Sequence, residues 1–422
     1  MENMIWSLPL IKGKKMFQAA QGNITRLYII KLSKWLMLTM PILYLFYREN
    51  GLAAQDLFIL KAVYSISIVA LEVPSGYLGD VWGRKATLIL GSVLGILGFG
   101  LYCMATGFWT FLACEIILGV GQSFISGSDS ALLYDTLQAA GKEKSYLRQE
   151  GRMISAGNFA EAVAAPLGVL IAMISLRTPF FFQAAVAFAA IPAALTLVEP
   201  ARQQMQGRTS FKQILGIVKY AIKDHKGLRA AILFSSLMGT ATLTMAWFVQ
   251  PYFAYLVLPL AWYGVLIPAL NLVAGFVSIH AWRLEHHMGR DPVMLFIAMG
   301  ICSGYLFMGL AGSTAGLVCL FAFYGVRGVA TPVLRNQINE IIPSDIRATV
   351  LSVRNLIIRL AFACLGPMLG WQTDRAGVPS ALVDAGLFFL LAGLGAAVYL
   401  IRITKTPGPA APADIKAKGS GL

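Results

Sequence analysis

Residues 76–85 read Gly-Tyr-Leu-Gly-Asp-Val-Trp-Gly-Arg-Lys and form a short polar stretch between two long apolar segments. Its three glycines permit tight turning and close approach of neighbouring helices. Asp80 precedes Arg84 and Lys85 by four and five residues, so the stretch carries both signs of charge. A charged stretch of this kind between two membrane-length segments indicates a hairpin that joins two transmembrane helices.

The composition of the 422-residue chain is that of a membrane protein, with 57% hydrophobic and 13% charged residues. Soluble domains carry roughly 25% charged residues, so most of this surface must face lipid. A spanning helix needs about 20 apolar residues, which allows roughly a dozen spans. Lipid admits only helices or closed barrels, and long apolar runs without alternation favour helices. We therefore predict an all-α membrane protein.

Twelve apolar segments of suitable length recur along the chain. The predicted spans are 25–47, 55–77, 86–106, 109–136, 148–174, 178–198, 227–256, 260–284, 291–312, 315–341, 346–372 and 379–402. The predicted domains are an N-terminal segment (1–24), a six-helix bundle (25–198), a linker that contains an amphipathic helix (199–226), a second six-helix bundle (227–402) and a disordered tail (403–422).

The net charge of +14 comes from Lys and Arg that cluster in alternate loops. The positive-inside rule then places both termini in the cytoplasm and the chain in the cytoplasmic membrane. This distribution favours a multi-pass membrane protein over a nucleic-acid-binding protein. The five cysteines all lie in apolar segments without a CxxC pair, so we expect no metal site and no cofactor.

An internal repeat supports two homologous halves. Three landmarks of the first half recur in the second in the same order, at offsets of 206, 206 and 201: Gly83-Arg84 and Gly289-Arg290, Gly119 and Gly325, and Ala165-Pro166 and Gly366-Pro367. Repeats of this kind commonly enclose a substrate site at their interface near the bilayer midplane.

The first hairpin resembles the most diagnostic signature of the major facilitator superfamily of secondary transporters, Gly-x-Leu-x-Asp-x-x-Gly-Arg-Lys. Its positions are filled by Gly76, Leu78, Asp80, Gly83, Arg84 and Lys85, although Val81 stands where the family often has Arg. The resemblance covers residues 25–402. It implies two six-helix bundles that rock between inward-open and outward-open states around a cavity lined by spans 1, 2, 4, 5, 7, 8, 10 and 11.

The resemblance also implies a cytoplasmic gate. Besides the hairpin residues, it includes Asp135 at the end of span 4, close to where the family places an acid that pairs with the hairpin arginine, here Arg84. Asp80 is expected to lie against the N-terminus of span 11, where the helix dipole favours an anion. Both contacts would close the cytoplasmic side in the outward-open state only.

Polar residues of span 4 are the first candidates for chemistry inside the membrane. Glu115, Gln122, Ser126 and Asp129 are separated by seven, four and three residues, which places them on one helical face. The face is either a cavity lining with a titrating acid or a structural face bonded to neighbouring helices. Glu115 occupies a position where many proton-coupled family members carry Arg. It could exchange a proton, attract a cationic substrate, or pair with Lys34 or Lys61.

Span 5 carries Asn158 and Glu161 ahead of Ala165-Pro166-Leu167-Gly168. This segment partly resembles the span-5 motif of antiporters in the family, with Ala165 in place of the usual Gly. Glu161 lies 13 residues into the span, about 20 Å at 1.5 Å per residue, and so near the midplane. We predict a proton or cation site at Glu161, and the alternative is that the segment serves only close helix packing.

Charged and aromatic residues of other spans are candidates for substrate binding. Arg327 lies in the middle of span 10, where its guanidinium would suit a carboxylate or phosphate or form an internal ion pair. Lys34 lies deep in span 1 and is expected to pair with an acid of span 4 or 5, whereas Lys31 is expected to snorkel to the interface. The full predicted set is Lys34, Gln122, Asn158, Trp247, Gln250, Asn271 and Arg327.

These features predict a secondary active transporter that exports a small organic molecule by proton antiport. The alternative on the same fold is an importer or facilitator of a zwitterionic or anionic metabolite. The sequence shows no phosphate-binding loop, nucleophile–base pair or His-rich metal site, so we predict no enzymatic activity and no catalytic residues. The expected partners are the lipid bilayer, the substrate and protons, and the chain is expected to act as a monomer. The proton-coupling candidates are Glu115, Glu161 and Asp129.

Overall fold

The computed structural model describes residues 22–200, 216–343 and 346–405. The predictions for most of the N-terminal segment, for the middle of the linker with its amphipathic helix, and for most of the tail concern residues outside these ranges.

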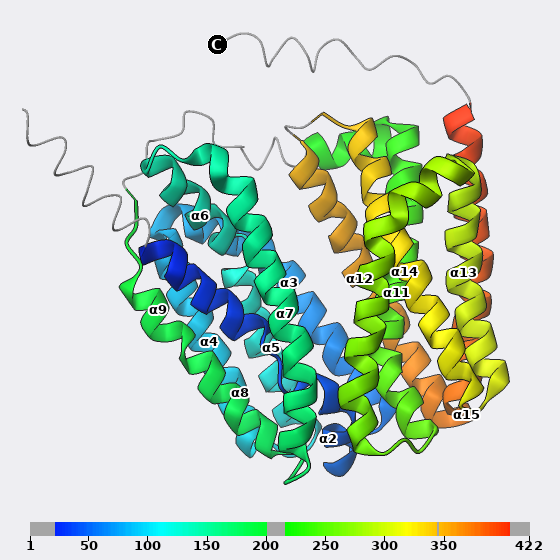
Figure 1. Cartoon of the computed structure of the whole chain (residues 1–422), viewed down its shortest axis with the longest axis horizontal. Coiled ribbons are helices and arrows are strands. Elements are labelled where there is room, and N and C mark those ends of the chain that lie inside the picture. Colours follow the sequence, from blue (N-terminus) through cyan, green and yellow to red (C-terminus); the bar gives the residue numbers. More distant parts are fainter. Residues whose placement is uncertain (1–21, 201–215, 344–345, 406–422) are drawn as a thin grey trace, which may run out of the picture.

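Across the described residues the protein is all-α. Eleven helical segments are long and apolar enough to cross a membrane, and Gly377 divides the last of them into two because its φ of 85° is not helical. The structure therefore has twelve spans in two six-helix bundles, as predicted. Figure 1 shows the bundles side by side, with the blue-to-green first half beside the green-to-red second half.

The bundles contain the following elements. The N-terminal bundle is built from a helix over 22–35, η2 (Met40–Ile42), α2 (Leu43–Glu49), α3 (Ala54–Trp82), α4 (Arg84–Met104), α5 (Phe108–Ile125), α6 (Ser128–Ala139), η3 (Glu143–Ser145), α7 (Tyr146–Ala172), α8 (Thr178–Phe188) and α9 (Ala190–Thr196). After η4 (Tyr220–Asp224), the C-terminal bundle is built from α11 (Lys226–Tyr255), α12 (Leu260–Met288), α13 (Arg290–Ala311), α14 (Ala315–Ile341) and α15 (Arg347–Lys405).

Two predicted spans near the site are broken helices. Span 1 leaves helical geometry after residue 35 and resumes at η2. Span 4 breaks between α5 and α6, where Gly127 has a φ of 82° and Ser126 is extended. The prediction that Glu115 and Asp129 share one continuous helical face was therefore wrong, because the break at Gly127 separates their helices.

Several helices run beyond the predicted apolar boundaries. α3 continues to Trp82, so residues 76–82 are helical and the turn of the hairpin is confined to Gly83. α12 continues to Met288, so His286 and His287 lie in its last turn and not in a loop. A helix can extend past the hydrocarbon because water satisfies its polar side chains there, and apolar length therefore underestimates helix length.

The two bundles meet at the end of the molecule where α3 begins, which we call the closed end. Asp374 of α15 accepts hydrogen bonds from the backbone N–H groups of Ala54 (2.9 Å) and Gln55 (2.7 Å). Gly370 fits tightly there, since a Cβ on it would lie 2.7 Å from the Cα of Gln55. The backbones of α3 and α15 therefore approach closely at this end.

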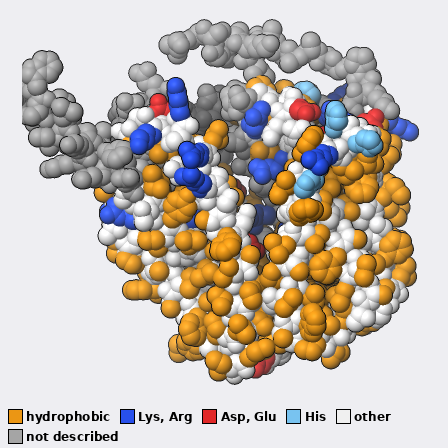
Figure 2. Space-filling model, viewed as in Figure 1, with side chains coloured by type: hydrophobic (Ala, Val, Ile, Leu, Met, Phe, Trp, Pro, Cys, Tyr) orange, Lys and Arg blue, Asp and Glu red, His pale blue; other side chains and the backbone are white. Residues whose placement is uncertain are grey.

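The opposite end, where α3 turns into α4, carries most of the Lys, Arg and His side chains visible in Figure 2, and we call it the basic end. The same view shows a hollow between the two bundles below this end and apolar side chains over the rest of the visible surface. Many large apolar side chains are exposed, Trp109 at 77% and Leu391 at 76% among them, as expected of a surface that faces lipid.

Candidate functional site

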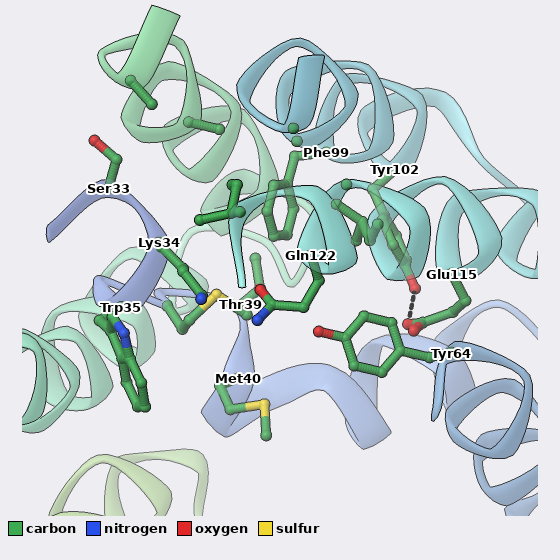
Figure 3. A pocket seen from close by; sticks show the side chains of 18 of the residues that line it. Ser33, Lys34, Trp35, Thr39, Met40, Tyr64, Phe99, Tyr102, Glu115 and Gln122 are labelled. Atoms are coloured by element: carbon green, nitrogen blue, oxygen red, sulfur yellow. Dashed lines mark hydrogen bonds between the residues drawn. The ribbon is translucent and has the colours of Figure 1, made fainter. Parts of the chain in front are cut away.

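A cavity of about 320 Å³ lies within the N-terminal bundle, which provides nearly all of its lining. Among the described residues of the C-terminal bundle, Trp247 of α11 alone lines it. The lining therefore differs from the expected set of spans, because α4 (span 3) and α8 and α9 (span 6) contribute to this cavity and spans 8, 10 and 11 do not. Of the predicted site residues, the cavity brings together Lys34, Glu115, Gln122, Glu161 and Trp247. Figure 3 shows Lys34, Gln122 and Tyr64 pointing toward one another across this space.

Glu115 is held in a buried cluster of four side chains. Its Oε1 accepts hydrogen bonds from the hydroxyls of Tyr47 (2.9 Å) and Tyr102 (2.5 Å), and Lys61 forms an ion pair with the same carboxylate. The Lys61 ammonium also lies 5.0 Å from the centre of the Trp247 ring. Of the two lysines considered for Glu115, the structure therefore selects Lys61.

Small residues allow this cluster to form. A Cβ on Gly119 would lie 2.7 Å from the Cβ of Ser67 and 2.9 Å from the carbonyl oxygen of Tyr64. Because Gly119 has no side chain, α5 can approach α3 closely one turn after Glu115. Lys61 and Glu115 are then near enough to neutralise each other, which a buried pair of charges requires.

Asp129 pairs with Lys31 and not with Lys34, for which an acidic partner in span 4 or 5 was expected. Its carboxylate forms an ion pair with Lys31 at 2.9 Å and accepts a bond from the backbone N–H of Ser130 at 2.8 Å. Lys31 is only 8% exposed, so the prediction that it snorkels to the interface was wrong. The break at Gly127 tilts Asp129 away from the α5 face and leaves it outside the cavity lining.

Lys34 and Glu161 line the cavity without such partners. Within the described ranges neither side chain forms a hydrogen bond or an ion pair, so the predicted pairing of Lys34 with an acid of span 4 or 5 was wrong. Arg327 of α14 interacts electrostatically with Glu161 from the other bundle, and its guanidinium lies 5.0 Å from the centre of the Tyr324 ring.

Gln250 joins the two bundles. Its Oε1 accepts from the backbone N–H of Tyr44 (2.9 Å), and its Nε2 donates to the carbonyl of Met40 (2.7 Å). Both partners belong to the irregular part of span 1, whose backbone groups need partners because the helix is interrupted. The amide of Gln250 is therefore occupied, and the side chain lies outside the cavity lining. Asn158 of α7 and Asn271 of α12 are exposed side chains that also lie outside it.

The hairpin at the basic end forms an electrostatic cluster with the end of span 4. Arg84 pairs with Asp135 at 2.8 Å, and Gly83 makes the turn with a φ of 106°. Gly76 and Asp80 are exposed on the last turns of α3, and the side chain of Lys85 is half-buried. The pair is present although the bundles are apart at this end, so the expectation that it forms in the outward-open state only was wrong. The gate role of these residues stays a prediction.

Sequence reasoning missed a residue that supports this hairpin. Glu199 accepts hydrogen bonds from the backbone N–H groups of Arg84 (3.0 Å) and Lys85 (2.8 Å) at the N-terminus of α4. An anion at a helix N-terminus satisfies free N–H groups and complements the helix dipole. No local sequence pattern predicts this contact, because Glu199 follows span 6 and lies more than a hundred residues after the hairpin in the sequence. Tyr47, Tyr102 and Asp374 were missed for the same reason.

The described part of the chain contains no group of three or more His, Cys, Asp or Glu side chains that could hold a metal ion. What the site offers is a cavity in the N-terminal bundle that borders on the C-terminal bundle at Trp247, with separate positive and negative side chains in its lining. A comparison with known families accounts for this architecture, since the profile of the major facilitator superfamily matches residues 33–363. The chain belongs to the major facilitator superfamily. It is therefore a membrane transporter of that superfamily.

Individual relatives within the superfamily are distant. The quinolone resistance protein NorA of Staphylococcus aureus is 23% identical over 171 residues, which cover 40% of this chain and 43% of NorA. The major facilitator-type transporter psiT2 of Psilocybe cubensis is 31% identical over 94 residues, or 22% of this chain and 18% of psiT2. Each alignment spans less than half of the relative.

Solved structures show the same fold along the chain. A bacterial homologue of the human lysosomal transporter Spinster, in an inward-facing and unoccupied conformation, aligns with a TM-score of 0.75 at 14% identity, covering 93% of this chain and 99% of that one. The nucleoside transporter NupG aligns with a TM-score of 0.71 at 15% identity, covering 93% and 99%. At these identities the similarity establishes the fold alone.

Proposed function

We propose that this protein exports a small organic molecule across the cytoplasmic membrane in exchange for protons. The observation that carries the proposal is the cavity of the N-terminal bundle, which is lined by a carboxylate without an ion-pair partner and borders on the other bundle through Trp247. Such a cavity suits alternating access, in which two repeats rock around one site. The similarity to NorA, a quinolone resistance protein, favours export as the direction.

The positive-inside rule places the basic end in the cytoplasm, with both termini on that side. The conformation is then inward-open, because the bonds of Asp374 and Gln250 join the bundles at the opposite end. For the cavity to face outward, these bonds must break. Asp80 would then approach the N-terminus of span 11 and hold the basic end closed.

Among the three predicted proton-coupling acids, Glu161 fits the role best. Glu115 is bound to Lys61 and two tyrosines, and Asp129 is bound to Lys31, so protonating either would strand a buried cation. Glu161 lines the cavity, and Arg327 acts on it from the other bundle. When charged, Glu161 attracts Arg327 and draws the bundles together on that side of the cavity. A proton removes this attraction, which links proton binding to the change of conformation.

The test uses proteoliposomes that contain pyranine and carry an imposed pH gradient. Norfloxacin, a quinolone chosen because of the NorA similarity, is the first probe. We expect norfloxacin to accumulate only when a gradient is present and to increase the proton flux reported by pyranine. Glu161→Gln should abolish both effects, because an amide carries no titratable proton.

Glu72→Gln is the matched control. Glu72 is a carboxylate of α3 that is also partly exposed but lies outside the cavity lining, so its variant should keep the coupling. Solute flux that ignores the pH gradient in every variant would refute proton coupling. Coupling that survives Glu161→Gln but is lost in Glu115→Gln would refute the assignment to Glu161.

A further inference from the structure

The cavity near Lys34 is rich in hydrogen-bond donors that have no partner. The Lys34 ammonium and the Gln122 amide point into the same space, and neither is bonded to another described residue. The indole Nε1 of Trp35, also part of the lining, is buried without a hydrogen-bond partner. A buried donor without an acceptor, such as this indole N–H, is costly, whereas Lys34 and Gln122 are half-buried and face the cavity. A ligand that supplies acceptors would therefore be favoured here.

The charges around Lys34 are unevenly compensated. Lys31 already neutralises Asp129, and Lys61 neutralises Glu115. Asp129 still attracts Lys34, but Lys31 and Arg359 both repel it. Arg359 belongs to α15 and lies outside the cavity lining, so its like charge acts on Lys34 from the other bundle. An anion bound at Lys34 would supply the counter-charge that Asp129, already paired with Lys31, provides only in part.

The remaining lining determines the shape of the ligand. Trp35, Trp247, Phe99 and Leu118 provide aromatic and apolar surface. A volume of about 320 Å³ is at the lower end of the range for ligand pockets, roughly 300–1,000 Å³. A compound with one or two fused rings and one acidic group would fit, whereas a large multi-ring drug would require the cavity to widen.

We propose that the cavity takes a small aromatic organic anion, with its acidic group on Lys34 and its ring against the aromatic lining. This inference deepens the proposed function, since it names the substrate class of the same cavity. Glu161 remains available as the proton site, because Lys34 and Glu161 do not interact with each other in the described structure.

The test compares three ligands that share one ring system but differ in charge: 1-naphthaleneacetate, 1-naphthaleneacetamide and 2-(1-naphthyl)ethylamine. Binding to the purified full-length chain in nanodiscs is measured by isothermal titration calorimetry. We expect the anion to bind at least about tenfold more tightly than the amide or the amine, because one charge-assisted hydrogen bond contributes about that factor in affinity.

Lys34→Met removes the charge and keeps the length of the side chain. It should weaken binding of naphthaleneacetate by roughly ten- to a hundredfold and leave binding of the neutral amide unchanged, which also shows that the cavity is intact. Lys34→Arg should retain the preference for the anion. Lys144→Met, at an exposed lysine in η3 far from the cavity lining, is the matched control and should bind all three ligands like the parent chain.

Three results would overturn the inference: an amine that binds as tightly as the anion, an anion-to-amide ratio unchanged by Lys34→Met, or no binding of any of the three. Flux measurements in proteoliposomes separate this inference from the proposed function. Naphthaleneacetate that binds through Lys34 but is not moved would refute export and leave the binding site standing. Proton-coupled export of the amine would refute the anion preference and leave the transporter function standing.

Discussion

The closed end depends on one carboxylate that bonds across the two bundles, and its removal should shift the conformational equilibrium. Asp374 accepts from two backbone N–H groups at the start of α3, at 2.9 and 2.7 Å. Asp374→Asn keeps one acceptor oxygen but loses the charge and the second bond. Because these N–H groups lie in the first turn of α3 and have no partner within the helix, the anion also complements the dipole of this 29-residue helix.

The magnitude follows from these two terms. A hydrogen bond to a charged group contributes about 1.5–3 kcal/mol, and a charge at a helix N-terminus adds about 0.3–1 kcal/mol. Asp374 is exposed, so solvent screening reduces both terms, and we expect a net loss of about 1–2 kcal/mol. This loss favours the state open at this end by roughly 5- to 30-fold. A minor state populated at about 1% would then rise to roughly 5–25%.

Double electron–electron resonance measures this shift directly. Spin labels at Thr106 and Thr314, exposed positions at the closed end of the two bundles, are introduced after the five native cysteines have been replaced. The parent chain should give one short distance, and Asp374→Asn should add a longer one. Asp384→Asn is the matched control, because its carboxylate bonds only to Gln372 within the C-terminal bundle. A distance distribution that is unchanged in both Asp374→Asn and Asp374→Ala would refute the role of Asp374 in holding this end closed.

Three further predictions concern other parts of the molecule. Lys61→Met should lower the free energy of unfolding by about 3–5 kcal/mol, because it leaves the buried Glu115 carboxylate without a counter-charge. Adding Glu115→Gln should restore most of the lost stability, measured as Tm in thermal unfolding, and equal Tm values for the single and double variants would contradict this. Gly168→Ala places a Cβ 1.9 Å from a backbone oxygen of span 1, so folded protein should fall sharply in size-exclusion profiles, whereas Gly100→Ala, which has open space, should fold like the parent chain. Asp80→Asn should slow transport without changing the Kd of naphthaleneacetate, and a matching loss of binding would mean that the hairpin supports the fold and is not a gate.

The number and order of the membrane spans could be predicted from the sequence because hydrophobic length is a local property. Each span needs only its own apolar residues, and the hairpin signature is contiguous from Gly76 to Lys85. The ends of the helices were less predictable. α3 and α12 continue beyond the hydrocarbon, where the sequence is already polar, so hydropathy could not indicate where they stop.

The pairing of charges inside the membrane could not be predicted, because it depends on how the helices rotate and break. Lys31 and Lys34 are three residues apart, and hydropathy treats them alike. The break of span 4 at Gly127 places Asp129 beside Lys31, so Lys34 has no ion-pair partner and lines the cavity. The sequence Ser126-Gly127-Ser128 did contain a turn signal, since a Gly between two serines favours a break. The apolar length of residues 109–136 nevertheless favoured one continuous span over two helices.

The buried ion pairs and the unpaired charges of the cavity have different roles: the pairs stabilise the fold, and the unpaired charges are free to bind substrate and proton. A buried pair such as Lys61–Glu115 is stable only while both charges remain, so neither member can lose its charge during a cycle without a large penalty. The groups that change their partners must therefore be those that the resting structure leaves without an ion pair, which among the described residues lining the cavity are Lys34 and Glu161. An anionic ligand at Lys34 and a proton at Glu161 would each neutralise one remaining charge. In an exchange cycle the two would bind in turn, the anion while the cavity is carried outward and the proton while it returns inward, so each change of conformation would occur with one of these two charges neutralised.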